Sequence, residues 1–145
     1  MIKVNIVCVG KIKEDFYRAA CAEYVKRLSR FCKTEIKEIA EGKNLKEEGA
    51  AILRALKGRV FALCVEGESL SSTQLAAQVK SCADRGEEIT FVIGSSCGLD
   101  DAVKSAAHIR LSFSEMTFPH QLMRVILLEQ VYRAFMINSG SEYHK

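Results

Sequence analysis

Apolar runs alternate with amphipathic stretches along almost the whole chain. Short apolar runs predict strands, and stretches in which apolar residues recur every three or four positions predict helices. The predicted strands are Lys3–Val9, Glu35–Ile39, Val60–Val65, Ile89–Ile93 and His108–Leu111. The predicted helices are Asp15–Phe31, Leu45–Leu56, Ser72–Ala83, Asp100–Ala106 and Pro119–Ile137. This alternation predicts an α/β domain with a mostly parallel sheet and helices on both faces.

Glycine and proline mark the ends of several predicted elements. Gly58 and Gly86 follow predicted helices, where glycine commonly closes the last turn. The chain has one proline, Pro119, and proline favours an extended residue before it, here Phe118. We therefore expect Pro119 to occupy the first position of the last helix, where a missing N–H has no consequence.

The length and composition suit one globular domain. The chain has 145 residues, of which 48% are hydrophobic and 27% are charged, unlike a disordered chain. We expect a single domain over residues 1–145. Every apolar run is shorter than the ~18 residues of a membrane span, and residues 1–15 lack the layout of a secretory signal. A cytoplasmic protein without membrane contact is therefore expected.

Six cysteines stand at positions 8, 21, 32, 64, 82 and 97. None belongs to a CxxC motif, and no Cys–His pair has the spacing of metal ligands. In a cytosolic chain the default is a reduced, mostly buried thiol. We therefore expect neither disulfides nor a metal site.

The predicted last helix is apolar around nearly its whole circumference. Such a helix is buried on more than one side. The single sheet would cover one side of this helix. We expect a second protomer to cover the other side, which predicts a homodimer. The alternative is a helix wedged into the centre of its own domain.

Positive charge is concentrated in the first part of the chain. Residues 1–59 hold 14 Lys and Arg against 8 Asp and Glu, whereas residues 60–145 hold 7 against 10. Much of the excess lies in residues 11–33. A basic face of this kind suits a phosphate backbone, although a solvated helix face would look the same.

Residues 91–101, FVIGSSCGLDD, predict a strand, a glycine-bracketed turn and a helix start. In open α/β sheets, ligands bind at the carboxyl ends of strands, and Gly94 would let one approach the backbone closely. The same residues fit the G-x-S-x-G elbow of serine hydrolases, with Ser96 as nucleophile. That alternative lacks an oxyanion segment of the HGGG type. An ordinary tight turn also remains open.

Residues 111–120, LSFSEMTFPH, form a polar segment that leads directly into the last predicted helix. His120 and Arg124 are four residues apart and therefore share a helix face near its N-terminus. The free N–H groups there favour an anion or a carboxylate. A capping or packing role for His120 remains open. Glu129 and Arg133, also four apart, are expected to form a structural ion pair.

The chain terminus, Glu142-Tyr-His-Lys145, is polar and aromatic. Residues at a terminus are usually frayed. If this segment docks, Tyr143 and His144 would supply a catalytic or RNA-contacting flap, and composition leaves the two possibilities open.

The stretch 111–135, LSFSEMTFPHQLMRVILLEQVYRAF, together with the terminal Tyr143-His144-Lys145, closely resembles the large-subunit ribosomal RNA (pseudouridine-N3)-methyltransferase H family of the SPOUT superfamily. The resemblance extends over the full chain, including KVNIVCVGKIK at the start, ALCVEG in the middle and the FVIG loop. It implies an α/β domain whose C-terminal part forms a trefoil knot, which general topology rules would not predict. It also implies an obligate dimer.

The resemblance further implies S-adenosylmethionine as the cofactor, bound in a bent pose within the knot. Leu63 would pack against the adenine region, and Gly94 would lie in the first knot loop. The remaining contacts would come largely from the backbone of Phe113, Ser114, Glu115, Met116, Thr117 and Phe118. The family usually has a second glycine at the position of Ser95, so a tighter backbone approach is expected there. No metal is implied.

The implied activity is methylation of N3 of a pseudouridine in 23S ribosomal RNA, with the assembled ribosome as the substrate particle. The N3 proton is weakly acidic and must leave around the time of methyl transfer. Arg124 would stabilise the developing anion, and His144 or Tyr143 would accept the proton. A non-catalytic, dimeric ribosome-binding module of the same fold remains a second possibility, with Ser95 as its only support.

Overall fold

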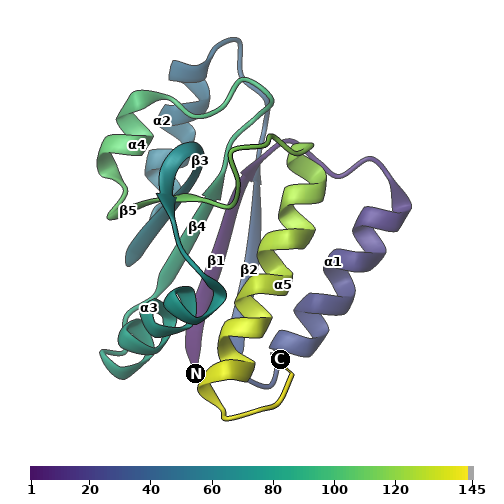
Figure 1. The fold of residues 1–145 in the computed structure, drawn as a ribbon. Helices are drawn as coiled ribbons and strands as arrows, with labels where there is room; N and C mark the ends of the chain where they lie inside the picture. Colours follow the sequence, from purple (N-terminus) through teal and green to yellow (C-terminus); the bar gives the residue numbers. More distant parts are fainter. Residues whose placement is uncertain (144–145) are drawn as a thin grey trace.

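The computed structural model of the protein describes residues 1–143. The strands are β1 (Ile2–Val9), β2 (Cys32–Ile39), β3 (Arg59–Ser69), β4 (Ile89–Ile93) and β5 (Ile109–Ser112). The helices are α1 (Asp15–Leu28), α2 (Leu45–Ala55), α3 (Ser72–Asp84), α4 (Asp101–Ala106) and α5 (His120–Asn138). Strands and helices alternate along the chain as predicted (Figure 1).

The strands form one sheet in the order β2-β1-β4-β3-β5, and every pair is parallel. Parallel strands require crossover connections, which the helices provide. In β1, Val4 and Ile6 face a larger apolar core, which α1, α3 and α5 cover. Val7 and Val9 face a smaller core under α2 and α4. The predicted parallel α/β domain with helices on both faces is confirmed.

β3 contacts β5 at two places. Leu63 pairs with Leu111, and after a shift in register Glu68 pairs with the same Leu111. The chain therefore bends round β5 between these two contacts. Gly67 lies at the closest approach, where a Cβ would be 2.8 Å from the carbonyl carbon and oxygen of Arg110. Only glycine leaves room for two backbones this close.

Three element boundaries differ from the prediction by three residues or more, and several others differ by one residue. β3 continues past Val65 to Ser69, because its polar last residues pair with β5 although they form no apolar run. α1 ends at Leu28, and β2 begins at Cys32, three residues earlier than predicted. Most of the side chains of β2 are exposed or half-buried, so this edge strand lacks the apolar run that identifies a strand in the sequence.

The predicted end signals of the helices are largely confirmed. Gly58 and Gly86 have φ values of +64° and +66°, a conformation that glycine adopts readily. Pro119 differs from the prediction. It precedes α5 with an extended ψ of 135°, and the helix begins at His120.

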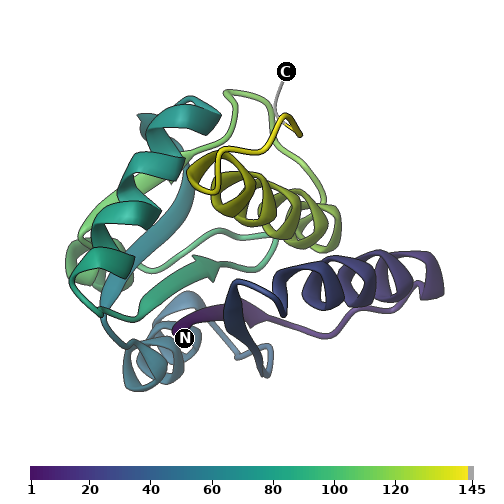
Figure 2. The same ribbon diagram turned by 90° about the horizontal axis from the view of Figure 1, so that it is seen from below.

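α5 lies between α1 and α3 in one layer, which is visible from below (Figure 2). Its Leu127, Leu128 and Val131 are fully buried in the larger core. Leu122 and Ile126, one turn apart, are only half-buried. The domain itself therefore covers one broad side of the helix and leaves an apolar stripe on another. Within residues 1–143, no helix has the length and apolar character to cross a membrane.

Candidate functional site

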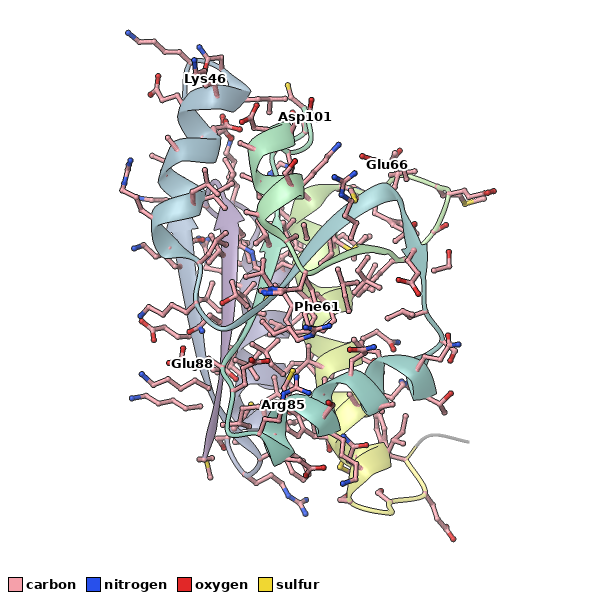
Figure 3. All side chains as sticks on the ribbon, turned by 90° about the vertical axis from the view of Figure 1, so that its left-hand side faces the viewer. Lys46, Phe61, Glu66, Arg85, Glu88 and Asp101 are labelled. Atoms are coloured by element: carbon pink, nitrogen blue, oxygen red, sulfur yellow. The ribbon has the colours of Figure 1, made fainter. Side chains whose placement is uncertain are left out.

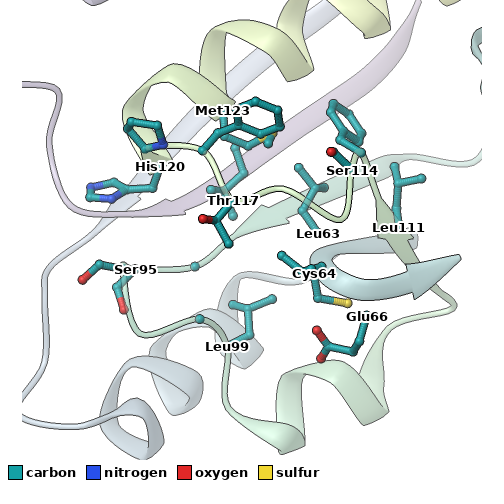
Figure 4. Close-up of a pocket in the computed structure, with 18 of the residues that line it drawn as sticks. Leu63, Cys64, Glu66, Ser95, Leu99, Leu111, Ser114, Thr117, His120 and Met123 are labelled. Atoms are coloured by element: carbon teal, nitrogen blue, oxygen red, sulfur yellow. The ribbon is translucent and has the colours of Figure 1, made fainter. Parts of the chain in front are cut away.

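A cavity of about 520 Å³ opens beyond the carboxyl ends of β4 and β5, beside the middle of β3 and next to the start of α5 (Figure 4). Parallel α/β sheets bind ligands at this edge, and the volume lies in the ordinary range for small-molecule sites. Three segments form most of the wall: residues 63–66, the loop after β4, and the connection from β5 to α5.

Seven of the eight predicted cofactor residues line this cavity: Leu63, Gly94, Phe113, Ser114, Met116, Thr117 and Phe118. Glu115 is exposed and is not part of the wall. The structure therefore brings together segments that are far apart in the sequence. The role of each residue toward a cofactor stays a prediction.

The connection from β5 to α5 is held mainly by serine hydroxyls. The Ser112 hydroxyl donates to the Ser114 carbonyl at 3.1 Å, and the Ser114 hydroxyl accepts from the Met116 N–H at 3.0 Å. Outside the helices and the strand pairings of the described chain, residues 113–118 make no backbone–backbone hydrogen bond. Backbone groups in proteins need partners, so most N–H and C=O groups of this segment remain for solvent or for a ligand.

The loop after β4 folds back on itself over Gly94. The Gly98 N–H donates to the Ser95 carbonyl at 2.9 Å, and Gly98 has a φ of +89°. A Cβ on Gly94 would lie 2.3 Å from the Gly98 carbonyl oxygen. Gly94 is therefore required by the loop's own backbone, whereas the prediction from sequence attributed it to ligand approach.

The tighter backbone approach to a cofactor at Ser95 stays a prediction, and the structure shows how this residue fits the loop. Its hydroxyl donates to Glu48 Oε1 at 3.1 Å, and no non-glycine residue in the described chain has a positive φ. The serine therefore fits this loop without backbone strain, and its side chain is bonded to α2.

One edge of the cavity is charged. Lys104 of α4 forms an ion pair with Glu66, which follows Cys64 and Val65 in the wall. The hydrogen bond from Lys104 lowers the pKa of Glu66, and Glu66 in turn raises the pKa of Lys104. Both groups are therefore charged at neutral pH. Burial raises the pKa of the Cys64 thiol in the same wall, so this thiol remains protonated.

His120 and Arg124 both approach Gly10 but have different surroundings. His120 lines the cavity. Arg124 is almost fully buried outside the cavity wall, with its guanidinium donating to Glu38 at 2.8 Å and to the Gly10 carbonyl at 3.1 Å. These bonds tie the start of α5 to the ends of β1 and β2. A catalytic role for Arg124 stays a prediction, and the geometry shows a structural one.

The chain between the end of α5 and Tyr143 lies at the opposite end of the helix from its start (Figure 1), and the start of α5 borders the cavity. The Tyr143 ring packs edge-on against Tyr132 at 5.2 Å, and the Arg133 guanidinium lies 5.0 Å from its centroid. The predicted Glu129–Arg133 ion pair is confirmed at 2.5 Å. The candidate His144 lies outside the described residues.

Two other types of site find no support in residues 1–143. No cluster of three His, Cys, Asp or Glu side chains there could hold a metal ion. Ser96 is exposed and makes no hydrogen bond to a histidine or an acid in that range, so the geometry of a serine hydrolase is missing.

Sequence reasoning did not single out Glu48, Gly67, Glu66 or Lys104. Gly49, inside a helix and next to Glu48, was an available signal, because glycine often marks a close approach between elements. Gly67, in a segment that pairs with β5, could have indicated a close approach between two backbones in the same way. Glu66 and Lys104 resemble ordinary surface charges in the sequence.

Comparisons with known proteins agree with the fold. The family model described as "Predicted SPOUT methyltransferase" matches residues 2–144. A protein named ribosomal RNA large subunit methyltransferase H, from Bifidobacterium animalis subsp. lactis, is 50% identical, with 99% of this chain and 100% of the relative covered. The protein of that name from Lactobacillus acidophilus is 46% identical over 99% of this chain and 100% of its own length.

A solved structure of a methylase family protein from Neisseria gonorrhoeae has a similar fold. Its TM-score is 0.51 at 10% identity, with 90% of this chain and 81% of that chain covered. The match of the family model and the two close relatives cover nearly the full length. The chain therefore belongs to the SPOUT methyltransferase family, among the proteins called ribosomal RNA large subunit methyltransferase H.

Proposed function

We propose that the protein uses S-adenosylmethionine to methylate N3 of a pseudouridine in 23S ribosomal RNA, on the assembled ribosome in the cytoplasm. The observation that supports this most directly is the cavity. The segments that carry the family resemblance, residues 94–98 and 111–120, line it together. The names of the relatives support ribosomal RNA as the substrate class.

The residues of the cavity fit the proposed cofactor. S-adenosylmethionine supplies a methyl group that is activated by its sulfonium sulfur. Leu63 and Phe113 offer apolar surface for the adenine, and the backbone groups of residues 113–118 other than the Ser114 carbonyl and the Met116 N–H offer donors and acceptors for its polar edge. The Lys104–Glu66 pair offers charged groups at the cavity edge.

The protein must also remove a proton from the substrate nitrogen. Burial raises the pKa of the Tyr143 phenol, and the Glu129 carboxylate adds to this effect. The phenol therefore keeps its proton at neutral pH and suits hydrogen-bond donation better than proton acceptance. This leaves His144 as the preferred general base, because imidazole titrates near neutral pH.

A homodimer in which each active site combines groups from both protomers would explain how the end of one chain can act at a cavity. α5 has 19 residues and is about 28 Å long at 1.5 Å per residue, with the cavity at one end and Tyr143 at the other. Tyr143 therefore lies far from the cavity of its own protomer. The half-buried Leu122 and Ile126 offer a stripe for a second copy. We propose that dimerisation there brings each tail to the partner's cavity, and that the bend of β3 round β5 is part of a trefoil knot.

Lysines on the basic face should contact ribosomal RNA phosphates. Arg27 is paired with Glu23 at 2.8 Å and stacks on Tyr24, so reversing its charge would also disturb local packing. The double variant Lys26→Glu and Lys33→Glu is a cleaner test. Ribosome binding should weaken, and the slope of log affinity against log salt should fall by roughly 0.9 for each phosphate that the protein no longer neutralises.

The double variant should bind the cofactor as the wild type does, which calorimetry can check. A salt slope equal to that of the wild type would show that this part of the basic face is only a solvated surface.

The proposed function is tested by calorimetry with S-adenosylhomocysteine, followed by transfer of labelled methyl to undermethylated ribosomes. Site-resolved alkylation locates the ligand, because Cys64 lines the cavity and should be protected. Cys97 is exposed outside the wall and serves as the internal control. Ligand binding without methyl transfer would favour the non-catalytic ribosome-binding module, and no binding would refute the proposal.

A further inference from the structure

A carboxylate near the start of α2 is buried beside the loop that follows β4 and lines the cavity. Glu48 is 7% exposed, and its two oxygens accept from the Gly42 N–H and the Ser95 hydroxyl, each at 3.1 Å. The helix does not need this side chain as a cap, because Asn44 accepts from the Glu47 N–H at 2.8 Å. A buried carboxylate is unfavourable unless its oxygens are bonded. The arrangement therefore depends on both partners.

Ser95 joins Glu48 to the turn of the loop after β4 by hydrogen bonds. Its hydroxyl, which donates to Glu48, also accepts from the Cys97 N–H at 3.3 Å. Its carbonyl accepts from the Gly98 N–H at 2.9 Å. Ser95 and Gly98 both line the cavity. A continuous series of hydrogen bonds thus leads from a buried group of α2 to the cavity wall.

α2 also approaches the far end of the same loop. A Cβ on Gly49 would lie 2.9 Å from the Cβ of Asp100, the residue that precedes α4. Figure 3 shows Lys46 and Asp101, at the starts of α2 and α4, at the same end of the molecule. α2 therefore contacts the loop near both of its ends, and Glu48 provides the polar contact.

We infer that Glu48 is a positioning residue which, through Ser95, holds the loop of residues 94–98 in the shape that accepts the cofactor. The inference rests on the proposed function, since it assigns a ligand to the cavity. Glu48 is bonded away from the cavity and touches neither cofactor nor substrate. Glu48 keeps the loop ordered. Its loss should therefore lower the cofactor affinity more than the rate of methyl transfer.

Four single variants and the double variant of Glu48→Ala with Ser95→Ala test the inference. Glu48→Ala and Ser95→Ala break the contact from either side. Glu48→Gln retains it, because a glutamine amide can accept from the Gly42 N–H and donate to the Ser95 hydroxyl. Glu47→Ala is the matched control, since it removes an exposed acid from the same turn of α2.

The first readout is hydrogen exchange at the Gly98 amide in the ligand-free protein. Its acceptor is the Ser95 carbonyl, which every variant keeps, so its exchange rate reports the order of the loop. We expect exchange at least about fivefold faster in Glu48→Ala and Ser95→Ala, as local opening becomes easier. Exchange in Glu48→Gln and Glu47→Ala should stay close to the wild-type rate.

The second readout is the affinity for S-adenosylhomocysteine. Each alanine variant should bind about tenfold more weakly, the effect of one hydrogen bond to a charged group. The double variant should be no weaker than the single ones, because both remove the same contact. KM for S-adenosylmethionine should rise about tenfold, whereas kcat at saturation should change less than about twofold. Glu48→Gln should restore most of the affinity.

Several results would overturn the inference. Wild-type exchange and affinity in Ser95→Ala would do so even if Glu48→Ala failed to fold. Additive losses in the double variant would show that the two residues act separately. Lower thermal stability of Glu48→Ala with unchanged affinity would reduce Glu48 to a structural role. If the wild type itself does not bind S-adenosylhomocysteine, the proposed function fails first and the inference fails with it.

Discussion

Deleting residues 143–145 should abolish most methyl transfer while cofactor binding and dimerisation persist. The deletion leaves the cavity and α5 intact, so the affinity for S-adenosylhomocysteine should change little. It removes the proposed proton acceptor and the groups that face the substrate, and general base catalysis typically contributes about 10²–10⁴-fold. Single-turnover methyl transfer to ribosomes measures the effect. Deleting only residues 144–145 preserves the contact of Tyr143 with Tyr132 and should cause nearly the same loss, because it still removes His144.

A mixed dimer tests whether the tail acts on the partner's cavity. One protomer would lack residues 143–145, and the other would carry Gly94→Val. If each site combines the cavity of one protomer with the tail of the other, one site of the mixed dimer is intact and activity returns. A site contained within one protomer would leave the mixed dimer inactive. Near wild-type transfer by the truncated homodimer would refute the role of the tail and leave His120 and Arg124 as candidates.

Gly94→Val should also have a large effect, in this case a loss of affinity for the cofactor. The new side chain would meet the Gly98 carbonyl oxygen, because even a Cβ at this position lies 2.3 Å from it. The loop must open, and the cavity wall must change shape. We expect affinity for S-adenosylhomocysteine to fall at least about tenfold, or ~1.4 kcal/mol, while the fold remains.

Calorimetry measures the affinity of the Gly94 variant, and circular dichroism checks its fold. Cys97→Val is the control, since it adds a branched side chain to an exposed position of the same loop that lies outside the cavity wall. If Gly94→Val binds the ligand as well as the wild type, the loop does not shape the cofactor site.

The alternation of elements was predictable because each buried strand and each amphipathic helix carries its own periodic signal. The end of β3 was not, because Glu68 and Ser69 join the sheet by pairing with β5, a contact that no local pattern records. The early start of β2 was hidden for a related reason, since an edge strand with exposed side chains lacks an apolar run.

The candidate site was predictable only in part. Conformational signals identified Gly94 and Gly98, and the family resemblance identified Leu63 and the segment after β5. Helical spacing placed His120 and Arg124 on one face, yet one turn along α5 the helix already faces the ends of β1 and β2, where Glu38 binds Arg124. The contact between Glu48 and Ser95 joins residues 47 positions apart, so it exists only in the folded chain.

The bend of β3 round β5 has a consequence for the order of folding. Leu111 must reach its place between Leu63 and Glu68 before either contact exists, and β5 follows all of the other strands along the chain. Pairings between distant segments form slowly, and synthesis delivers the N-terminal elements first. The first four strands can therefore assemble while the cavity is still missing a wall. Cofactor binding would then report the last stage of folding. A nascent chain that stalls before β5 is in place would be inactive even if its first four strands had already formed a sheet.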